Sequence, residues 1–275
     1  MSKVITFGNF KGGTGKTTNS AMIAYTLSNL GYKTLLVDLD PQANATALCL
    51  RTKQRITNNI VTFDKTLMSA VAEGDLSDII IDIKENLFLL PSFADFTSYP
   101  LFLEKKFPNN QFGRVTYFNT LLSEIKEEYD FVLVDVPPTL SSYTDSALFA
   151  SDYTIIVLQT QERSLVGAEA YVVYLQELID NYHADFDILG VLPVLLKNNS
   201  KVDESTLEVA HNKFGSENIF KTLVKNMERL KRYDIIGIVD SRLDSKADMH
   251  DRRVAELYEK VTREMLERLQ QKELK

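Results

Sequence analysis

Cysteine is nearly absent from this chain, and its scarcity excludes several kinds of site. Cys49 is the only cysteine among 275 residues, so an intrachain disulfide and a cysteine-ligated iron–sulfur cluster are both excluded. Long apolar runs are absent too, because none approaches the roughly 18 residues that a membrane-spanning helix needs. The first residues pass from MSK directly into VITF, without the pattern of a signal peptide. We therefore expect a cytoplasmic protein.

Positive charge is also scarce, except toward the C-terminus. The formal net charge is −7, which argues against a uniformly basic nucleic-acid-binding protein. Residues 1–189 contain 14 Lys and Arg against 23 Asp and Glu, whereas residues 190–275 contain 17 against 15. Within the second part, the segment 221–232 has five basic residues and one acid. Any basic surface is expected there.

Strand-like apolar runs alternate with helical patterns along the chain. The runs are continuously hydrophobic, which is typical of parallel strands covered on both faces. They lie at 4–8, 34–38, 87–90, 131–135, 154–158 and 188–192, with a weaker candidate at 235–239; helical patterns lie at 17–30, 162–180, 203–214 and 248–272. The segment 98–114 is the most loop-like. This alternation predicts a single α/β domain over 1–275, with a doubly wound, mostly parallel sheet and helices on both faces.

The last predicted helix carries one apolar stripe among many charged residues. Its members recur at spacings of three and four: Val254, Leu257, Tyr258, Val261, Met265 and Leu269. Such spacing predicts packing against the domain. A membrane-binding helix is the alternative, but acidic residues interrupt the tail and no Phe or Trp marks an inserted face.

The segment 7–20, FGNFKGGTGKTTNS, contains a glycine-rich phosphate-binding motif between a predicted strand and a predicted helix. The glycines at 12, 13 and 15 allow backbone N–H groups to converge on phosphate oxygens, and the helix N-terminus favours negative charge. Lys16 is expected to reach the β- and γ-phosphates, and the Thr17 hydroxyl to ligate Mg²⁺. The expected nucleotide contacts are Lys11, Gly12, Gly13, Thr14, Gly15, Lys16, Thr17 and Thr18.

Two predicted strands end in aspartate. Asp38 ends the strand 34–38, with Asp40 two residues later, and Asp135 ends the strand 131–135 before the sequence VPP. A single strand-terminal Asp often serves only as a turn residue. The carboxyl ends of parallel strands meet at one edge of a sheet, however, where ligands bind. Asp135 is therefore expected to hold a metal-bound water, as a Walker B carboxylate does.

The motif KGGTGKT, with its additional lysine, resembles the deviant phosphate loop of the ParA/MinD class of dimeric ATPases. The segments DLDPQANAT, NLFLLPS, LQTQERSLVGAEAY and ILGVLP resemble ParA partition ATPases, especially the Soj-like chromosomal and small plasmid members, so the resemblance covers nearly the whole chain. It implies that Lys11 crosses to the partner's nucleotide in an ATP-bound dimer, like an arginine finger. It also implies that Asp40 activates the attacking water and that Asp38 supports the metal shell formed with Thr17 and Asp135. Lys11, Lys16 and Asp40 are thus the predicted catalytic residues.

The same resemblance implies the cofactors and partners. ATP and Mg²⁺ are expected to drive dimerisation and non-specific binding of double-stranded DNA on the nucleoid, and a ParB-type centromere-binding protein is expected to stimulate a slow hydrolysis. Binding to phosphates requires several basic side chains together, and the candidates are Lys221, Lys225, Arg229, Lys231 and Arg232. The alternative is a MinD-like, membrane-associated regulator, which the composition of the tail disfavours.

This chain departs from the family pattern in several places. Thr14 replaces a commoner valine, in a position expected to face the surface, and Phe10 replaces a usual glutamine. A proline that usually completes the adenine pocket is missing from 222–232, which leaves only Asn226 and Lys197 as neighbourhood candidates for adenine contacts. Because the phosphate loop begins as early as Lys11, we expect no N-terminal helix-turn-helix domain. The three histidines, His183, His211 and His250, lack metal-ligand spacing.

Overall fold

The computed structural model describes residues 1–62, 64–196, 201–242 and 244–274. These residues form an eight-stranded sheet with the order β3-β4-β2-β5-β1-β6-β7-β8. The strands are β1 (Lys3–Gly8), β2 (Thr34–Asp38), β3 (Ile81–Lys84), β4 (Leu87–Leu90), β5 (Phe131–Asp135), β6 (Tyr153–Gln159), β7 (Asp187–Leu196) and β8 (Val224–Lys225). All neighbouring strands are parallel except β3 and β4, which form an antiparallel pair at one edge.

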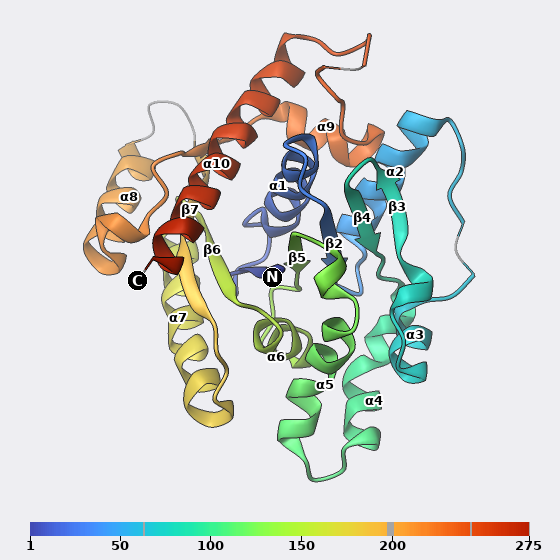
Figure 1. The fold of residues 1–275 in the computed structure, drawn as a ribbon. Coiled ribbons are helices and arrows are strands. Elements are labelled where there is room, and N and C mark those ends of the chain that lie inside the picture. The colour runs from blue at the N-terminus through green and yellow to red at the C-terminus, as the bar shows by residue number, and fades with distance from the viewer. Residues whose placement is uncertain (63, 197–200, 243, 275) are drawn as a thin grey trace.

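Helices cover both faces of the sheet, as Figure 1 shows. One face carries α1 (Lys16–Asn29), α2 (Asn44–Thr57), α9 (Glu228–Ile236) and α10 (Met249–Glu273). The other carries α3 (Leu67–Glu73), α4 (Tyr99–Lys106), α5 (Gln111–Ser123), α6 (Ser142–Phe149), α7 (Glu162–Tyr182) and α8 (Lys201–Phe214). The predicted doubly wound α/β fold is confirmed. Its physical basis is visible in the central strands, which are buried along their whole length and therefore need apolar residues in succession.

Two segments differ from their predicted structure. Ile235 and Ile236 end helix α9 rather than begin a strand, because Gly237 follows with a φ of 80° and lies against the backbone of α2. The segment 98–114 is mostly helical, not a loop. Tyr99 and Leu103 anchor α4 in the core, and the Asn110 side chain caps α5 by accepting a hydrogen bond from the Gly113 N–H at 2.9 Å.

The C-terminal helix α10 packs on α1, as its apolar stripe predicts. Five members of the stripe are buried, and Leu257 is partly buried against the same core. Its N-terminus is fixed by a capping box formed by Asp248 and Asp251. Among the described residues, no helix is both long enough and apolar enough to cross a membrane.

Candidate nucleotide site

The sheet brings the three predicted motifs together. Strand β5 lies between β1 and β2, and Asp135 pairs in register with both Phe7 and Asp38. The phosphate loop after β1 and the two aspartates therefore lie at the same carboxyl edge, which is the usual ligand site of an open α/β sheet.

The backbone of the phosphate loop has the geometry that its glycines predict. Gly13 and Gly15 have φ values of 73° and 86°, in the left-handed region that glycine adopts without strain. Gly15 is also the N-cap of α1, and no side chain caps this helix. The first N–H groups of α1 are consequently available to an anion.

Lys16 points into this site and is almost fully buried. Its side chain is 6% exposed, and Nζ donates a hydrogen bond to the Asn9 carbonyl at 3.2 Å. Burial lowers the pKa of the amine, whereas the carboxylates of Asp135 and Asp40 oppose that shift. A buried lysine facing two carboxylates is a suitable ligand for phosphate oxygens.

Asp135 is fully buried at the end of β5. Neither of its carboxylate oxygens has a partner of good geometry among the described residues, although the nearby Thr17 hydroxyl favours its charged form. Burial raises the pKa of Asp135 to about 8, and the neighbouring Asp38 adds to the shift. An orphaned buried carboxyl group is costly unless a ligand satisfies it. Its chemistry suits a hydrated Mg²⁺, and Thr17 supplies a second oxygen beside it.

Asp38 and Asp40 have different surroundings. The two oxygens of Asp38 accept hydrogen bonds from the Asp40 N–H at 3.1 Å and from the N–H and hydroxyl of Thr46, both at 2.8 Å. Burial raises the pKa of Asp38 to about 6. Asp38 thus fastens the loop that carries Asp40, and its expected support of the metal shell stays a prediction. Asp40 itself is 8% exposed and accepts a hydrogen bond from the Gln42 N–H at 2.9 Å.

Lys11 does not point at the same groups as Lys16. Its Nζ donates to Oε1 of Gln159 at 2.9 Å and to Oε1 of Gln161 at 2.8 Å, at the junction of β6 and α7. Partial burial lowers the pKa of this amine, and the nearby positive charge of Arg163 lowers it further. The backbone N–H of Lys11 donates to the Asn9 side chain at 2.8 Å. Lys11 is therefore held on its own subunit, away from the carboxylates.

Thr14 corrects one expectation about the loop. Its side chain is fully buried rather than surface-facing, and its hydroxyl donates to the Lys11 carbonyl at 3.4 Å. The turn of the loop folds this side chain inward while Gly12 and Gly13 stay exposed. Gly12 faces the segment after Asp135, since a Cβ there would lie 3.8 Å from Pro138 Cγ. The phosphate loop and the segment after Asp135 are thus in contact.

Sequence reasoning missed several residues that support the loop. The Asn9 amide donates to the Val157 carbonyl at 2.9 Å and ties the loop to β6. The Asn19 side chain donates to the Gly15 carbonyl at 2.7 Å and accepts from the Tyr258 hydroxyl at 3.1 Å. Asn9 lies next to the motif and could have been suspected. Gln159, Gln161 and Tyr258 reach the loop only through tertiary contacts, so no local signal identifies them.

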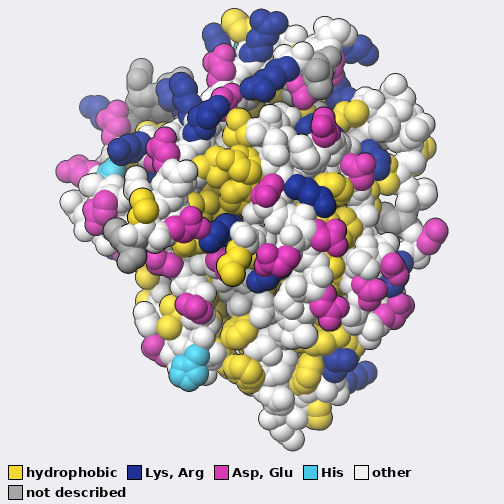
Figure 2. All heavy atoms as spheres, viewed as in Figure 1, with side chains coloured by type: hydrophobic (Ala, Val, Ile, Leu, Met, Phe, Trp, Pro, Cys, Tyr) yellow, Lys and Arg dark blue, Asp and Glu magenta, His cyan; other side chains and the backbone are white. Residues whose placement is uncertain are grey.

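The predicted DNA-contact residues lie on β8, on α9 and, for Lys221, in the segment just before β8. Lys221, Lys225, Lys231 and Arg232 are exposed. Arg229 is different: its side chain is 12% exposed and forms ion pairs with Asp248 and Asp251. Its charge is compensated within the protein, so the structure argues against Arg229 as a DNA contact. Figure 2 shows Lys and Arg side chains gathered over the upper end of this face, where Figure 1 places α9 and the start of α10.

The structure says little about the two candidates for adenine contacts. The Asn226 N–H donates to the Leu196 carbonyl at 2.9 Å at the edge of the sheet, and Lys197 lies outside the described residues. The described part of the chain contains no group of three or more His, Cys, Asp and Glu side chains that could hold a metal ion by themselves.

Comparisons with known proteins identify the family of this chain. The family model described as an AAA domain matches residues 2–188. The chromosome-partitioning ATPase Soj of Treponema pallidum is 26% identical over 98% of both chains. The virulence plasmid ParA family protein pGP5-D of Chlamydia psittaci is 31% identical over 69% of this chain and 68% of its own.

Solved structures share the fold. The ATP complex of the D38A variant of McdA from Cyanothece has a TM-score of 0.79 at 20% identity and covers 96% of both chains. Cobyrinic acid a,c-diamide synthase from Mycobacterium smegmatis, with ADP and magnesium, has a TM-score of 0.70 at 23% identity and covers 86% of this chain and 92% of its own. The chain therefore belongs to the ParA family of P-loop ATPases.

Proposed function

We propose that this protein is an ATP-dependent DNA-partition ATPase whose ATP-bound dimer binds DNA non-specifically. The observation that carries the proposal is the different placement of the two lysines of the phosphate loop. Lys16 faces its own Asp135 and Asp40, whereas Lys11 is directed to Gln159 and Gln161 at the start of α7. A lysine that does not serve its own site is available to a second copy of the chain.

The surface around Lys11 supports a dimer. Leu140, in the segment after Asp135, is 63% exposed, and Val166, near the start of α7, is 59% exposed. Both flank the phosphate loop, because Pro138 approaches Gly12 and Gly167 approaches the Lys11 backbone. Covering apolar side chains is favourable. A face-to-face dimer would bury them and bring each Lys11 toward the partner's triphosphate.

The residues of this chain then have separate roles in hydrolysis. The loop N–H groups and Lys16 bind the phosphates, and Asp40 orients the attacking water. Thr17 and Asp135 would hold Mg²⁺, the latter through water. One solved relative carries ADP and magnesium, and another carries ATP. Bound Mg²⁺ supplies neutralisation of phosphate charge. The partner's Lys11 adds positive charge only in the dimer, so hydrolysis depends on pairing.

DNA binding is assigned to Lys221, Lys225, Lys231 and Arg232, all of which are exposed. Dimerisation would double the number of these charges on one particle, and affinity for DNA rises steeply with the number of phosphates contacted. A ParB-type partner would accelerate hydrolysis and so release the dimer from DNA. Association with the nucleoid and a slow intrinsic turnover belong to the same proposal.

The test is DNA retention measured with ATP, with ADP and without nucleotide, at two salt concentrations. We expect salt-sensitive retention with ATP alone. Lys11→Ala should bind ATP but remain monomeric and fail to retain DNA, whereas Lys16→Ala should lose ATP binding itself. Normal hydrolysis by a monomeric Lys11→Ala protein would overturn the role of the lysine in the partner's site.

A membrane-associated regulator receives no support from the described residues. The apolar stripe of α10 is buried against α1 and cannot also insert into a bilayer. Co-sedimentation with anionic liposomes in the presence of ATP is the matching control, and we expect none.

A further inference from the structure

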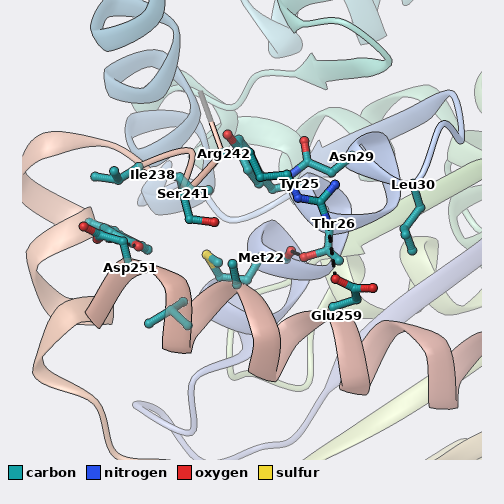
Figure 3. A pocket seen from close by; sticks show the side chains of 14 residues that line it. Met22, Tyr25, Thr26, Asn29, Leu30, Ile238, Ser241, Arg242, Asp251 and Glu259 are labelled. Atoms are coloured by element: carbon teal, nitrogen blue, oxygen red, sulfur yellow. Dashed lines mark hydrogen bonds and ion pairs between the residues drawn. The ribbon is translucent and has the colours of Figure 1, made fainter. Parts of the chain in front are cut away.

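The interface between α1 and α10 is only partly filled by side chains. A cavity of about 30 Å³ lies between them, lined by Met22, Tyr25 and Thr26 of α1 and by Asp251 and Val254 of α10, among others (Figure 3). Such a volume suits about one water molecule. Across it, Arg242 forms an ion pair with Glu259 at 3.3 Å, drawn as the dashed contact in Figure 3. Polar contacts therefore help to set the position of α10.

The most buried of these contacts reaches the phosphate loop. Tyr258, the residue before Glu259, is fully buried, and its hydroxyl donates to Asn19 Oδ1 at 3.1 Å. Asn19 is 2% exposed, and its Nδ2 donates to the Gly15 carbonyl at 2.7 Å. A hydroxyl in the C-terminal helix is thus connected through one side chain to the N-cap of α1.

The Gly15 carbonyl, which can only accept, determines which way the Asn19 amide faces, and Oδ1 is thereby left to accept from the Tyr258 hydroxyl. If the amide were reversed, Nδ2 would meet the tyrosine oxygen and Oδ1 would face the Gly15 carbonyl, placing two acceptors together. Only the orientation with the tyrosine donating satisfies both contacts. Gly15 has a left-handed φ of 86°, and a Cβ there would lie 3.2 Å from Nδ2, so the amide also packs closely on this residue.

We propose that Tyr258 is a positioning residue for the phosphate loop and acts through Asn19 on Gly15. The contact holds the loop in its binding conformation before nucleotide arrives, and such preorganisation increases affinity because less ordering is needed on binding. The inference rests on the proposed nucleotide site. Because Tyr258 acts through Asn19, its effect is on binding and not on the chemical step.

The test compares Tyr258→Phe with Tyr233→Phe. Both tyrosines are buried, and the Tyr233 hydroxyl donates to Asp251 at 2.8 Å, away from the loop. Loss of one buried hydrogen bond should weaken binding of a non-hydrolysable ATP analogue about fivefold in Tyr258→Phe. KM should rise by the same factor while kcat stays unchanged. Both variants should lower the unfolding midpoint by a similar amount. Tyr233→Phe, however, should bind the analogue with the affinity of the wild type.

The double variant Asn19→Ala/Tyr258→Phe separates this mechanism from general loosening. If the tyrosine acts through Asn19, the double variant binds the analogue no more weakly than Asn19→Ala alone. Additive losses, equal losses in the two tyrosine variants, or an unchanged affinity in Tyr258→Phe would each overturn the proposal. Failure of the wild-type protein to bind the analogue would instead refute the proposed function.

Discussion

At the scale of single residues, the site is defined by how each charge is satisfied. Asp38 has three donors, Asp135 has no partner of good geometry among the described residues, and Lys11 is held by two glutamines. These differences assign different tasks to residues that look alike in the sequence. Satisfied groups hold the structure in place, whereas the unsatisfied carboxyl group is ready for a ligand.

The glutamines that hold Lys11 should oppose dimerisation, because the lysine must leave them to reach a partner. We expect Gln159→Ala/Gln161→Ala to increase the dimer fraction severalfold at a fixed, subsaturating ATP concentration, measured by analytical ultracentrifugation. Gln176→Ala, an exposed glutamine of α7 bonded to Asp180, is the matched control and should change nothing. A lower dimer fraction in the double variant would mean that the glutamines assist the interface.

At the scale of elements, the junction of α9 and α10 depends on a mostly buried ion pair. Arg229 contacts Asp251 at 3.4 Å as well as Asp248, and Asp251 is 1% exposed. The neighbouring pair Lys231–Glu228 is exposed on both sides. The same basic segment therefore contains a structural arginine and basic side chains that are exposed to solvent.

Arg229→Met should destabilise the protein by about 3 kcal/mol, because it leaves buried Asp251 without its cation. Lys231→Met should change the free energy of unfolding by less than about 0.5 kcal/mol, as is usual for exposed pairs. Urea unfolding measures both. Equal changes in the free energy of unfolding would show that the contribution of Arg229 to stability does not depend on its burial.

Helix α6 contains a carboxyl group whose burial gives a pH dependence. Burial raises the pKa of Asp145 to about 6, and the Tyr174 hydroxyl donates to it. A raised pKa in the folded state means that stability falls as the pH rises from 4 to 6 and stays lower above that range. Asp145→Asn should flatten this dependence and gain about 1–3 kcal/mol at pH 8. The measurement is thermal unfolding of both proteins across this range. Parallel pH profiles of Asp145→Asn and the wild type would contradict the prediction.

The elements also show how far sequence patterns extend. The central strands and the helices α1, α7 and α10 were predicted close to their observed bounds, since continuous burial and regular apolar spacing leave a local pattern. Short edge strands such as β3 and β8 leave none, as four and two residues are too few for a period. Helices α4 and α5 were missed, since 98–114 was predicted to be the most loop-like segment. Pro100 lies in the first turn of α4, where proline is tolerated.

At the scale of the whole molecule, the charge distribution predicts which surface would serve the proposed DNA binding. The net charge is −7, so binding must depend on a local surface. Lys231 and Arg232 are adjacent and exposed on α9, near the start of α10. Lys105 and Lys106 form a similar exposed pair at the end of α4, on the other face of the sheet.

Reversing the first pair should abolish most DNA retention. We expect Lys231→Glu/Arg232→Glu to weaken ATP-dependent binding at least tenfold and to reduce its salt dependence, because each lost phosphate contact lowers the slope by about one unit. Lys105→Glu/Lys106→Glu makes the same charge change and should retain binding. Equal losses in the two variants would indicate an effect of net charge and discard the assigned surface.

The sequence by itself determined the phosphate loop, the aspartates at the strand ends and the alternation that makes the sheet. Each depends on residues that are adjacent or regularly spaced, so the chemistry can be read locally. Only the tertiary structure decided that Thr14 is buried, that Arg229 is paired, that Lys11 is held by Gln159 and Gln161, and that Tyr258 supports Gly15 through Asn19. Those contacts either join residues that are distant in the chain or depend on how the backbone turns a side chain. Packing decides both, so no local sequence pattern predicts them.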